Sequence, residues 1–292
     1  MRGQDAPPRR PARSRPMDAK LQRRIQRYGW DLAADDYEAL WNAQLAPARS
    51  AMLQLASLAP GEQVLDIACG TGLVTLPAAR AVAPAGEAYG IDVSGRMVEA
   101  ARCRAAEQEI ANARFTRMDG EALPIPDSSF DAALCALGLM YMPDPRRAVR
   151  EMMRVVRPGG RIVLAVWGER VRCGWSPLFG IVDDEVTSEV CPLFFQLGQE
   201  SALSALCEGL GLELVRERRL STRMIYRDAT EACNAAFVGG PVALAWSRFD
   251  LSVRARVRER YVEAIEPWRN GHGYAIPGEF VVVSALTPPA RH

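Results

Sequence analysis

The feature that most constrains this chain is a buried strand that runs directly into a glycine turn. Residues 64–69 read Val-Leu-Asp-Ile-Ala-Cys and are followed by Gly70-Thr71-Gly72 and a helical pattern from about Leu73. A strand that is apolar on both faces is typical of a sheet covered by helices on both sides. The glycines let the backbone approach a ligand closely and expose N–H groups at a helix start. The segment therefore predicts a nucleotide-like ligand at the end of a parallel strand.

Strand and helix patterns alternate after this turn, and they predict an α/β fold with a mostly parallel sheet and helices on both faces. Two helical patterns between about 21 and 58 precede the first strand. The further strands are expected at 87–93, 113–118, 130–136, 161–167, 213–226 and 279–286, and the further helices at about 95–110, 145–156, 178 onward, 201–211 and 228–269.

The N-terminal residues 1–18 mix Arg and Pro with few apolar residues, so we expect a disordered basic tail. The alternative is a basic arm that contacts a partner. Residues 19–292 are expected to form one domain, because both flanks of the 228–269 segment return to the same sheet. Its parts are N-terminal helices (19–60), a cofactor-binding core (61–169), C-terminal strands and helices (170–227 and 270–292) and a helical lid insertion (228–269).

The charges nearly balance, with 36 Lys and Arg against 35 Asp and Glu. A net charge of +1 argues against a main task on nucleic acid or anionic membrane, and it favours a small-molecule substrate. No apolar run is long enough for membrane insertion and no signal peptide is recognisable, which predicts a cytoplasmic protein. The seven cysteines form no CxxC pair and are expected to be reduced thiols.

The counts of histidine and lysine argue against a metal site and against a catalytic lysine. The chain has two histidines and no HExxH motif, so no metal site is expected. Lys20 is the only lysine and lies near the N-terminus, which excludes a Schiff-base mechanism in the core.

Three carboxylates lie at the C-terminal edges of the first three predicted strands: Asp66, Asp92 and Asp119. Ligands of open α/β sheets bind at the carboxyl ends of the strands, so these acids are expected at one ligand site. A nicotinamide dinucleotide is disfavoured, because the GxGxxG fingerprint would need Gly at positions occupied by Ala68 and Leu73.

Four segments together resemble the class I S-adenosylmethionine-dependent methyltransferases, in particular their UbiE-like small-molecule branch. They are VLDIACGTG (64–72), GIDVSGRM (90–97), RMDGEALPIPDSSFDAALC (117–135) and EMMRVVRPGGRIVLAVW (151–167). The resemblance implies a Rossmann-like, seven-stranded sheet with an antiparallel last strand, and S-adenosyl-L-methionine as cofactor, with S-adenosyl-L-homocysteine as product.

The resemblance also implies roles for individual residues. The turn would wrap the methionyl moiety, with Asp66 on its ammonium, Asp92 on the ribose, Met97 and Asp119 at the adenine, and Ala136 near the sulfonium. The full set implied for the cofactor is Asp66, Ala68, Cys69, Gly70, Thr71, Gly72, Asp92, Val93, Met97, Asp119, Gly120 and Ala136.

The acceptor site is less defined by the sequence. Five aromatic residues are candidates to bind the substrate, and for each of them core packing is the alternative: Tyr37, Trp41, Tyr141, Trp167 and Trp175. No catalytic base stands out, and His272 and Tyr141 are the weak candidates.

These observations predict methyl transfer to a small, apolar or aromatic acceptor by in-line displacement, driven mainly by positioning. Because no catalytic base is recognisable, the alternative is a non-catalytic nucleotide-binding or regulatory protein with the same fold. The oligomeric state stays open between a monomer and a homodimer.

Overall fold

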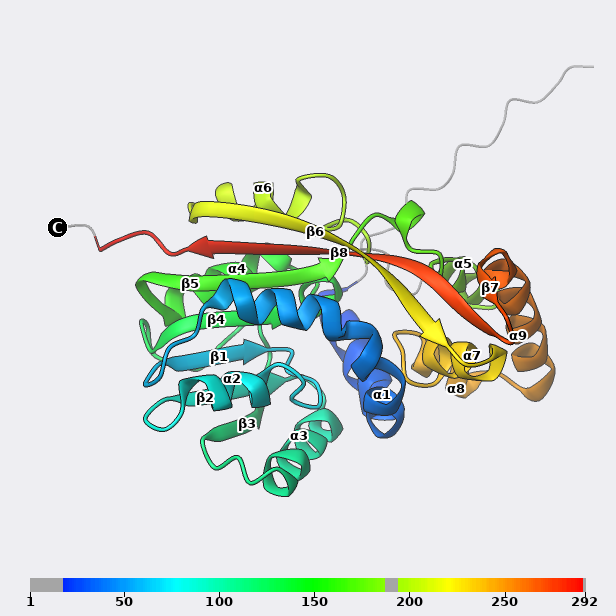
Figure 1. Cartoon of the computed structure of the whole chain (residues 1–292), viewed down its shortest axis with the longest axis horizontal. Helices are drawn as coiled ribbons and strands as arrows, with labels where there is room; N and C mark the ends of the chain where they lie inside the picture. The colour runs from blue at the N-terminus through cyan, green and yellow to red at the C-terminus, as the bar shows by residue number, and fades with distance from the viewer. Residues whose placement is uncertain (1–17, 187–193, 291–292) are drawn as a thin grey trace, which may run out of the picture.

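The computed structural model describes residues 18–186 and 194–290. Its central sheet has the strand order β3-β2-β1-β4-β5-β8-β6, and the short β7 pairs with β8 (Figure 1). β8 runs antiparallel to both of its long neighbours, while β1 to β5 are parallel. This confirms the expected α/β fold. The strands are β1 Gln63–Ile67, β2 Glu87–Asp92, β3 Ala113–Arg117, β4 Phe130–Ala136, β5 Val156–Trp167, β6 Glu213–Tyr226, β7 Arg269–Asn270 and β8 Gly273–Leu286.

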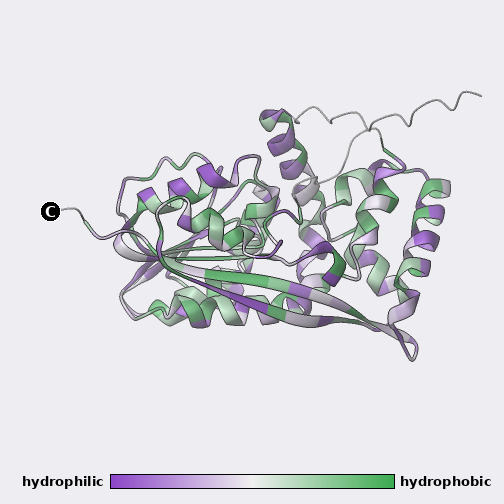
Figure 2. Cartoon of the chain, turned by 90° about the horizontal axis from the view of Figure 1, so that it is seen from above, coloured by the Kyte–Doolittle hydropathy of each residue, from purple (hydrophilic) through white to green (hydrophobic). Residues whose placement is uncertain are grey.

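Helices cover both faces of the sheet, as Figure 2 shows from above. On one face, the second half of α1 (Ala19–Ala56), α2 (Thr75–Val82) and α3 (Gly95–Glu107) bury side chains such as Met52 and Leu76 against the strands. On the other face lie α4 (Pro145–Val155) and α6 (Ala202–Glu208). Burial on both faces explains why these strands are apolar throughout.

Helix α1 is a single helix of 38 residues, where the sequence predicts two helical segments. Pro47 lies inside it and removes one backbone donor, but the helix continues through this position. In Figure 1 the helix bends, so that its second half covers the sheet while its first half reaches the end of the strands. This bend places the first half of α1 beside the glycine turn.

The C-terminal part adds a helical group at the far ends of β6 and β8 (Figure 1). It contains α5 (Pro177–Asp183), α7 (Ala229–Phe237), α8 (Ala243–Arg248) and α9 (Leu251–Ile265). Helices α7 and α8 pack against α1, where Gly239 lies next to Leu40 and Gly29 next to Leu244. The helical segment expected at 228–269 is therefore present. Whether it acts as a lid stays a prediction.

Two local expectations need correction. The helix expected at 201–211 is the shorter α6, and Ser201, whose position before the helix suggested a cap, is left-handed with φ 55° and accepts no capping hydrogen bond. β5 begins at Val156, which pairs with Phe130 of β4, and β8 begins at Gly273, which pairs with Asn270 of β7, so both strands start earlier than predicted.

Residues 1–17, most of the predicted tail, lie outside the described residues. Within the described residues no helix combines the length and apolar character needed to span a bilayer. Six cysteines in this part of the chain are free thiols, and Cys191 lies outside it.

Candidate active site

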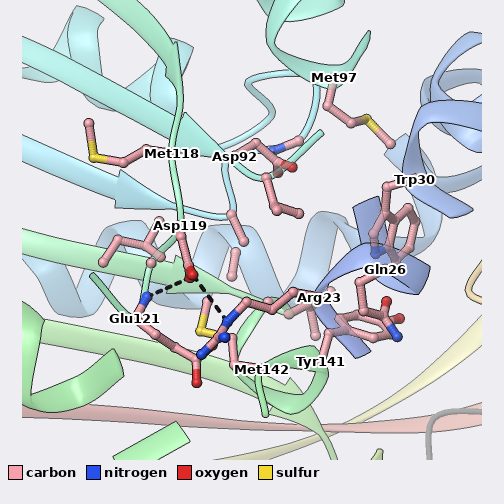
Figure 3. A pocket seen from close by; sticks show the side chains of 18 of the residues that line it. Arg23, Gln26, Trp30, Asp92, Met97, Met118, Asp119, Glu121, Tyr141 and Met142 are labelled. Atoms are coloured by element: carbon pink, nitrogen blue, oxygen red, sulfur yellow. Dashed lines mark hydrogen bonds and ion pairs between the residues drawn. The ribbon is translucent and has the colours of Figure 1, made fainter. Parts of the chain in front are cut away.

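The carboxyl ends of β1, β2 and β4 and the residues after β3 surround a cavity, which we call the outer cavity (Figure 3). It holds about 740 Å³ of space, including its open mouth. A smaller inner cavity of about 350 Å³ adjoins it and shares Tyr37, Ala68, Gly70, Ala136 and Leu137 with it. This is the size range of sites for small molecules and cofactors.

Asp92 lies at the end of β2 and holds the glycine turn in place. Its carboxylate accepts hydrogen bonds from the amide of Gly70 (2.9 Å) and the amide of Ser94 (2.8 Å). Burial raises the pKa of Asp92 to about 6, although these amide donors oppose the shift. Each carboxylate oxygen has two lone pairs, so Asp92 can accept two further hydrogen bonds from hydroxyl groups in the outer cavity.

Asp66 lies in β1 and lines the inner cavity. One oxygen accepts a hydrogen bond from the Thr75 hydroxyl at 2.6 Å, and the other is buried without a partner among the described residues. Burial raises the pKa of Asp66 to about 7. A buried acceptor without a partner costs about 1 to 3 kcal/mol, so Asp66 is prepared for a cationic ligand.

Arg49 of α1 lies on the same inner cavity and was not found by the sequence analysis. Its guanidinium donates to the carbonyl of Leu73 and to Asn42, but the buried Nε has no partner among the described residues. The buried hydroxyl of Thr71 is also unpaired in the described structure. The inner cavity thus combines an acceptor for a cation, Asp66, with a donor for an anion, Arg49, as a zwitterionic group requires.

The turn itself adopts left-handed backbone conformations at Ala68 (φ 57°), Gly70 (φ 52°) and Gly72 (φ 84°). Glycine adopts this region freely, whereas alanine pays about 1 kcal/mol. Gly138, after β4, accommodates the Ala68 side chain, because a Cβ at position 138 would lie 2.3 Å from the Ala68 Cβ. The alanine in the turn and the glycine facing it form a complementary pair.

Asp119 lies at the outer cavity and is engaged by α1. Its carboxylate accepts from the Glu121 amide (2.9 Å) and pairs with Arg23 (3.1 Å), as the dashed lines in Figure 3 show. Arg23 also donates to the buried carboxylate of Glu121 at 2.6 Å. The start of α1 is therefore tied to the edge of the cavity by charge-assisted hydrogen bonds.

Four α1 residues line the outer cavity: Arg23, Gln26, Trp30 and Tyr37. Only Tyr37 was a candidate from the sequence. The spacing of three, four and seven residues places all four on one helical face, and this periodicity is the signal that could have found the others. Burial raises the pKa of Tyr37 well above its usual value, so its hydroxyl stays neutral.

The cofactor residues implied by the resemblance fall into three groups. Asp66 and Cys69 line the inner cavity. Thr71 and Gly72 line neither cavity. The remaining eight line the outer cavity: Ala68, Gly70, Asp92, Val93, Met97, Asp119, Gly120 and Ala136.

The structure separates the candidates for the acceptor. Tyr37 and Tyr141 lie on the wall of the outer cavity, whereas Trp41, Trp167 and Trp175 are buried in the core. The Trp167 ring contacts Trp41, Trp175 and Phe280 at centroid distances of 6.2, 4.7 and 4.2 Å. These three tryptophans pack in an aromatic cluster, and none of them lines the outer or the inner cavity.

His272 is not brought to the cavity. It is exposed at the turn between β7 and β8, at the far end of the extended strands, and it cannot reach a substrate in the outer cavity (Figure 1). Tyr141, the other catalytic candidate, lies at the cavity wall with its ring against Trp30 and Phe194.

Comparison with known proteins finds a matching domain and similar sequences. Residues 64–160 match the model of a methyltransferase domain, which spans the glycine turn, the three acids and β1 to β4. Over this third of the chain, the sequence is therefore similar to a methyltransferase domain. A demethylmenaquinone methyltransferase of Geobacillus sp. (strain WCH70) is 34% identical over 119 residues, which are 41% of this chain and 51% of that protein.

A second relative is the ubiquinone/menaquinone biosynthesis C-methyltransferase UbiE of Ectopseudomonas mendocina (strain ymp). It is 35% identical over 142 residues, or 48% of this chain and 54% of that protein. The chain thus spans about half the length of these curated relatives. A putative methyltransferase from Bacillus halodurans C-125 shares the fold, with a TM-score of 0.60 at 19% identity over 83% of this chain and 99% of that chain.

The residues present fit S-adenosyl-L-methionine, the cofactor that the resemblance to methyltransferases implies. Its amino acid end carries an ammonium and a carboxylate, which match the Asp66 oxygen and the Arg49 Nε that lack partners among the described residues in the inner cavity. Its ribose hydroxyls match the remaining acceptor positions of Asp92 in the outer cavity. The unpaired atoms of the inner cavity thus have natural partners in this cofactor.

Proposed function

We propose that this protein is a cytoplasmic enzyme that transfers the methyl group of S-adenosyl-L-methionine to a small, apolar or aromatic organic acceptor. The observation that carries the proposal is the inner cavity, where a carboxylate oxygen of Asp66 and the Nε of Arg49 are buried without partners among the described residues, beside a strained glycine turn. Burying polar atoms without hydrogen-bond partners costs free energy, and a bound ligand of matching charge would supply the partners.

The chain's own residues would divide the binding of the cofactor between the two cavities. Asp66 would hold the ammonium, and Arg49 would hold the carboxylate. Asp92 would accept hydrogen bonds from the ribose, while Met97 and Asp119 line the part of the outer cavity that remains for the base. The negative charges of Asp66 and Asp92 would also favour a positively charged ligand in these partly buried surroundings.

The bound cofactor would supply an electrophilic methyl group on a sulfonium. The leaving group is then a neutral thioether, which needs no acid to protonate it. The protein then contributes orientation and exclusion of water, which are worth several kcal/mol in a two-substrate reaction. Trp30 and Tyr141 pack edge to face at 5.2 Å and close the α1 side of the outer cavity. This aromatic wall supports an apolar or aromatic acceptor.

The relatives suggest which acceptor to test first. Their names describe methylation of a demethylmenaquinone and C-methylation in quinone biosynthesis. An electron-rich ring carbon, as in a hydroquinone, is a nucleophile that needs little help from a base. Of the two catalytic candidates from the sequence, Tyr141 lies at the outer cavity and His272 does not, so an acceptor that needs little help from a base agrees with this cavity.

The test is a radiolabel assay with the purified protein, S-adenosyl-L-methionine labelled in its methyl group, and a panel of hydroquinones, phenols and amines. We expect label on an aromatic acceptor, and no label with Asp92→Ala at the same cofactor concentration. Binding of the cofactor without transfer to the panel or to any small molecule of a cell extract would favour the non-catalytic alternative.

A further inference from the structure

The first part of α1, residues 19–32, carries apolar side chains on the side that faces solvent. Leu21, Tyr28 and Leu32 are spaced by seven and four residues, so they share one helical face. Their exposed fractions are 38%, 46% and 49%, and they are three of the seven exposed large apolar side chains among the described residues. We call these three residues the outer stripe of α1.

Folding of the chain explains the opposite face of this helix but not the outer stripe. Arg23, Gln26 and Trp30 face the outer cavity, and at 100° per residue they lie roughly 180° around the helix from Leu21 and Leu32. A helix that only covers the cavity needs one apolar face, the one that packs against the protein. The outer stripe is therefore a second apolar face without a partner in the described structure.

Cations flank the outer stripe. An open groove next to the outer cavity is lined by Lys20, Arg24 and Arg27 of α1 and by Arg117 at the end of β3, together with Asp18 and Asp119. The side chains of Lys20 and Arg24 form no ion pair with the described residues. The nearby acids are engaged, since Asp31 accepts from Ser94 at 2.6 Å and Asp35 pairs with Arg96 at 2.7 Å.

The distribution of charge along the chain supports the same conclusion. Residues 1–27 contain nine Lys and Arg and two Asp and Glu, so the remaining residues have 27 cations and 33 acids. The net charge of +1 hides a basic N-terminal region on a net negative body. The first turns of α1 also project away from the sheet, as Figure 2 shows.

We propose that the outer stripe and the cations beside it dock this protein on the surface of an anionic lipid bilayer. A helix with Lys and Arg beside a stripe of Leu and Tyr lies in the headgroup region, where apolar side chains enter the acyl boundary and cations meet anionic lipids. RNA would use the cations but not Leu21 and Leu32. A second copy would use the stripe but would repel its own basic region.

The docked helix would place the outer cavity next to the bilayer, because the opposite face of the same helix lines that cavity. Docking does not depend on methyl transfer, so each can fail without the other.

The experiment is flotation of the full chain with vesicles of phosphatidylcholine alone and of phosphatidylcholine with one quarter phosphatidylglycerol. We expect binding to the anionic vesicles that weakens with salt, and much weaker binding to the neutral ones. The double variant Lys20→Gln/Arg24→Gln should lower the partition coefficient roughly 30-fold, at about fivefold per cation. Leu21→Gln/Leu32→Gln should lower it about tenfold or more.

Matched controls lie elsewhere on the surface. Arg216→Gln/Arg218→Gln removes two exposed cations of β6, and Val171→Gln/Leu251→Gln removes two exposed apolar side chains. Both should bind vesicles within about threefold of the wild type. All variants should keep the melting temperature of the wild type, which shows that α1 is intact.

Three outcomes would overturn the proposal. The first is no flotation of the wild type, or equal binding to neutral and anionic vesicles. The second is retention of an RNA oligonucleotide by a chain that does not bind vesicles. The third is a dimer that Leu21→Gln/Leu32→Gln dissociates, again without vesicle binding.

Discussion

Two buried acids make ligand binding depend on pH. Burial raises the pKa of Asp66 to about 7 and that of Asp92 to about 6, while an unfolded Asp titrates near 4. The folded apoprotein therefore binds extra protons between about pH 4 and 7, and its free energy of unfolding falls as the pH rises through this window. An ammonium ligand requires ionised Asp66, so its affinity should change in the opposite direction.

We predict that the affinity for S-adenosyl-L-homocysteine rises about threefold between pH 6.5 and 7.5 and levels off above that. Asp66→Asn should bind more weakly and lose this rise, because its side chain does not ionise. Calorimetric titrations at the two pH values measure both effects. An equal pH dependence in the wild type and the variant would assign the titration to another group.

The pair of Ala68 and Gly138 allows a test of the turn by a double-mutant cycle. Gly138→Ala should lower the free energy of unfolding by about 2 kcal/mol, because its Cβ would overlap that of Ala68. In an Ala68→Gly background the same change should cost much less, since the nearest remaining contact is Cys135 Sγ at 3.2 Å. Urea denaturation of the four proteins gives the coupling, and purely additive costs would contradict the complementary pair.

At the residue scale, the sequence predicted the positions that follow from the pattern of strands and helices. The acids follow strands whose apolar character is unmistakable, so their position at one edge of the sheet could be predicted. The location of Trp167 and Trp175 could not, because an aromatic residue after a strand suits a core and a pocket equally well. The structure decides this through ring contacts with side chains more than one hundred positions away, such as Phe280.

At the scale of elements, the first half of α1 is held to the cavity by one half-buried arginine. Arg23 pairs with Asp119 and with the buried Glu121. The pair between Arg96 of α3 and Asp35 of α1 is largely exposed, with 59% and 76% of the side chains accessible. Exposed ion pairs contribute little, and a buried carboxylate without its partner is costly.

We therefore expect Arg23→Met to speed amide hydrogen exchange in residues 19–26 by about tenfold or more. The control Arg96→Met removes the exposed pair between α3 and α1, and it should change exchange in residues 19–26 by less than about threefold. Mass spectrometry of the exchanged peptides compares the two. Similar acceleration in both variants would show that Arg23 has no special part in fixing α1.

Element boundaries show where sequence patterns stop being sufficient. β6 was predicted at its observed limits, but β8 begins six residues earlier than expected. The stretch Gly-Tyr-Ala-Ile-Pro-Gly contains residues that weaken a strand by themselves. It becomes a strand because Met224 to Tyr226 of β6 pair with it, a long-range contact that no local pattern contains.

At the scale of the whole molecule, the half that lines the proposed cofactor site could be predicted from the sequence better than the C-terminal half. The residues that match a methyltransferase domain, 64–160, include nearly all of β1 to β4. In contrast, β6, the helical group and β8 lie beyond residue 160. The sequence therefore predicted the cofactor and the overall sheet well, and the acceptor poorly. Specificity depends on segments whose arrangement follows from tertiary packing.

Binding of the cofactor product should stabilise the entire domain by mass action. At one hundred times its dissociation constant, S-adenosyl-L-homocysteine adds about 2.7 kcal/mol. For a domain of this size we expect the melting temperature to rise by roughly 5 °C, as measured by differential scanning calorimetry. Adenosine, which lacks the groups that Asp66 and Arg49 would bind, should give a smaller shift at equal concentration. Equal shifts would remove the inner cavity from the binding site.

The central claim is that the acids at the carboxyl edge of the sheet hold S-adenosylmethionine, and calorimetric titration of the wild type and Asp92→Ala with S-adenosyl-L-homocysteine tests it most directly. We predict one binding site in the wild type and a loss of about 2 to 4 kcal/mol in the variant, or roughly 30- to 1,000-fold in affinity. No binding by the wild type, or equal affinity of the two proteins, would contradict the claim.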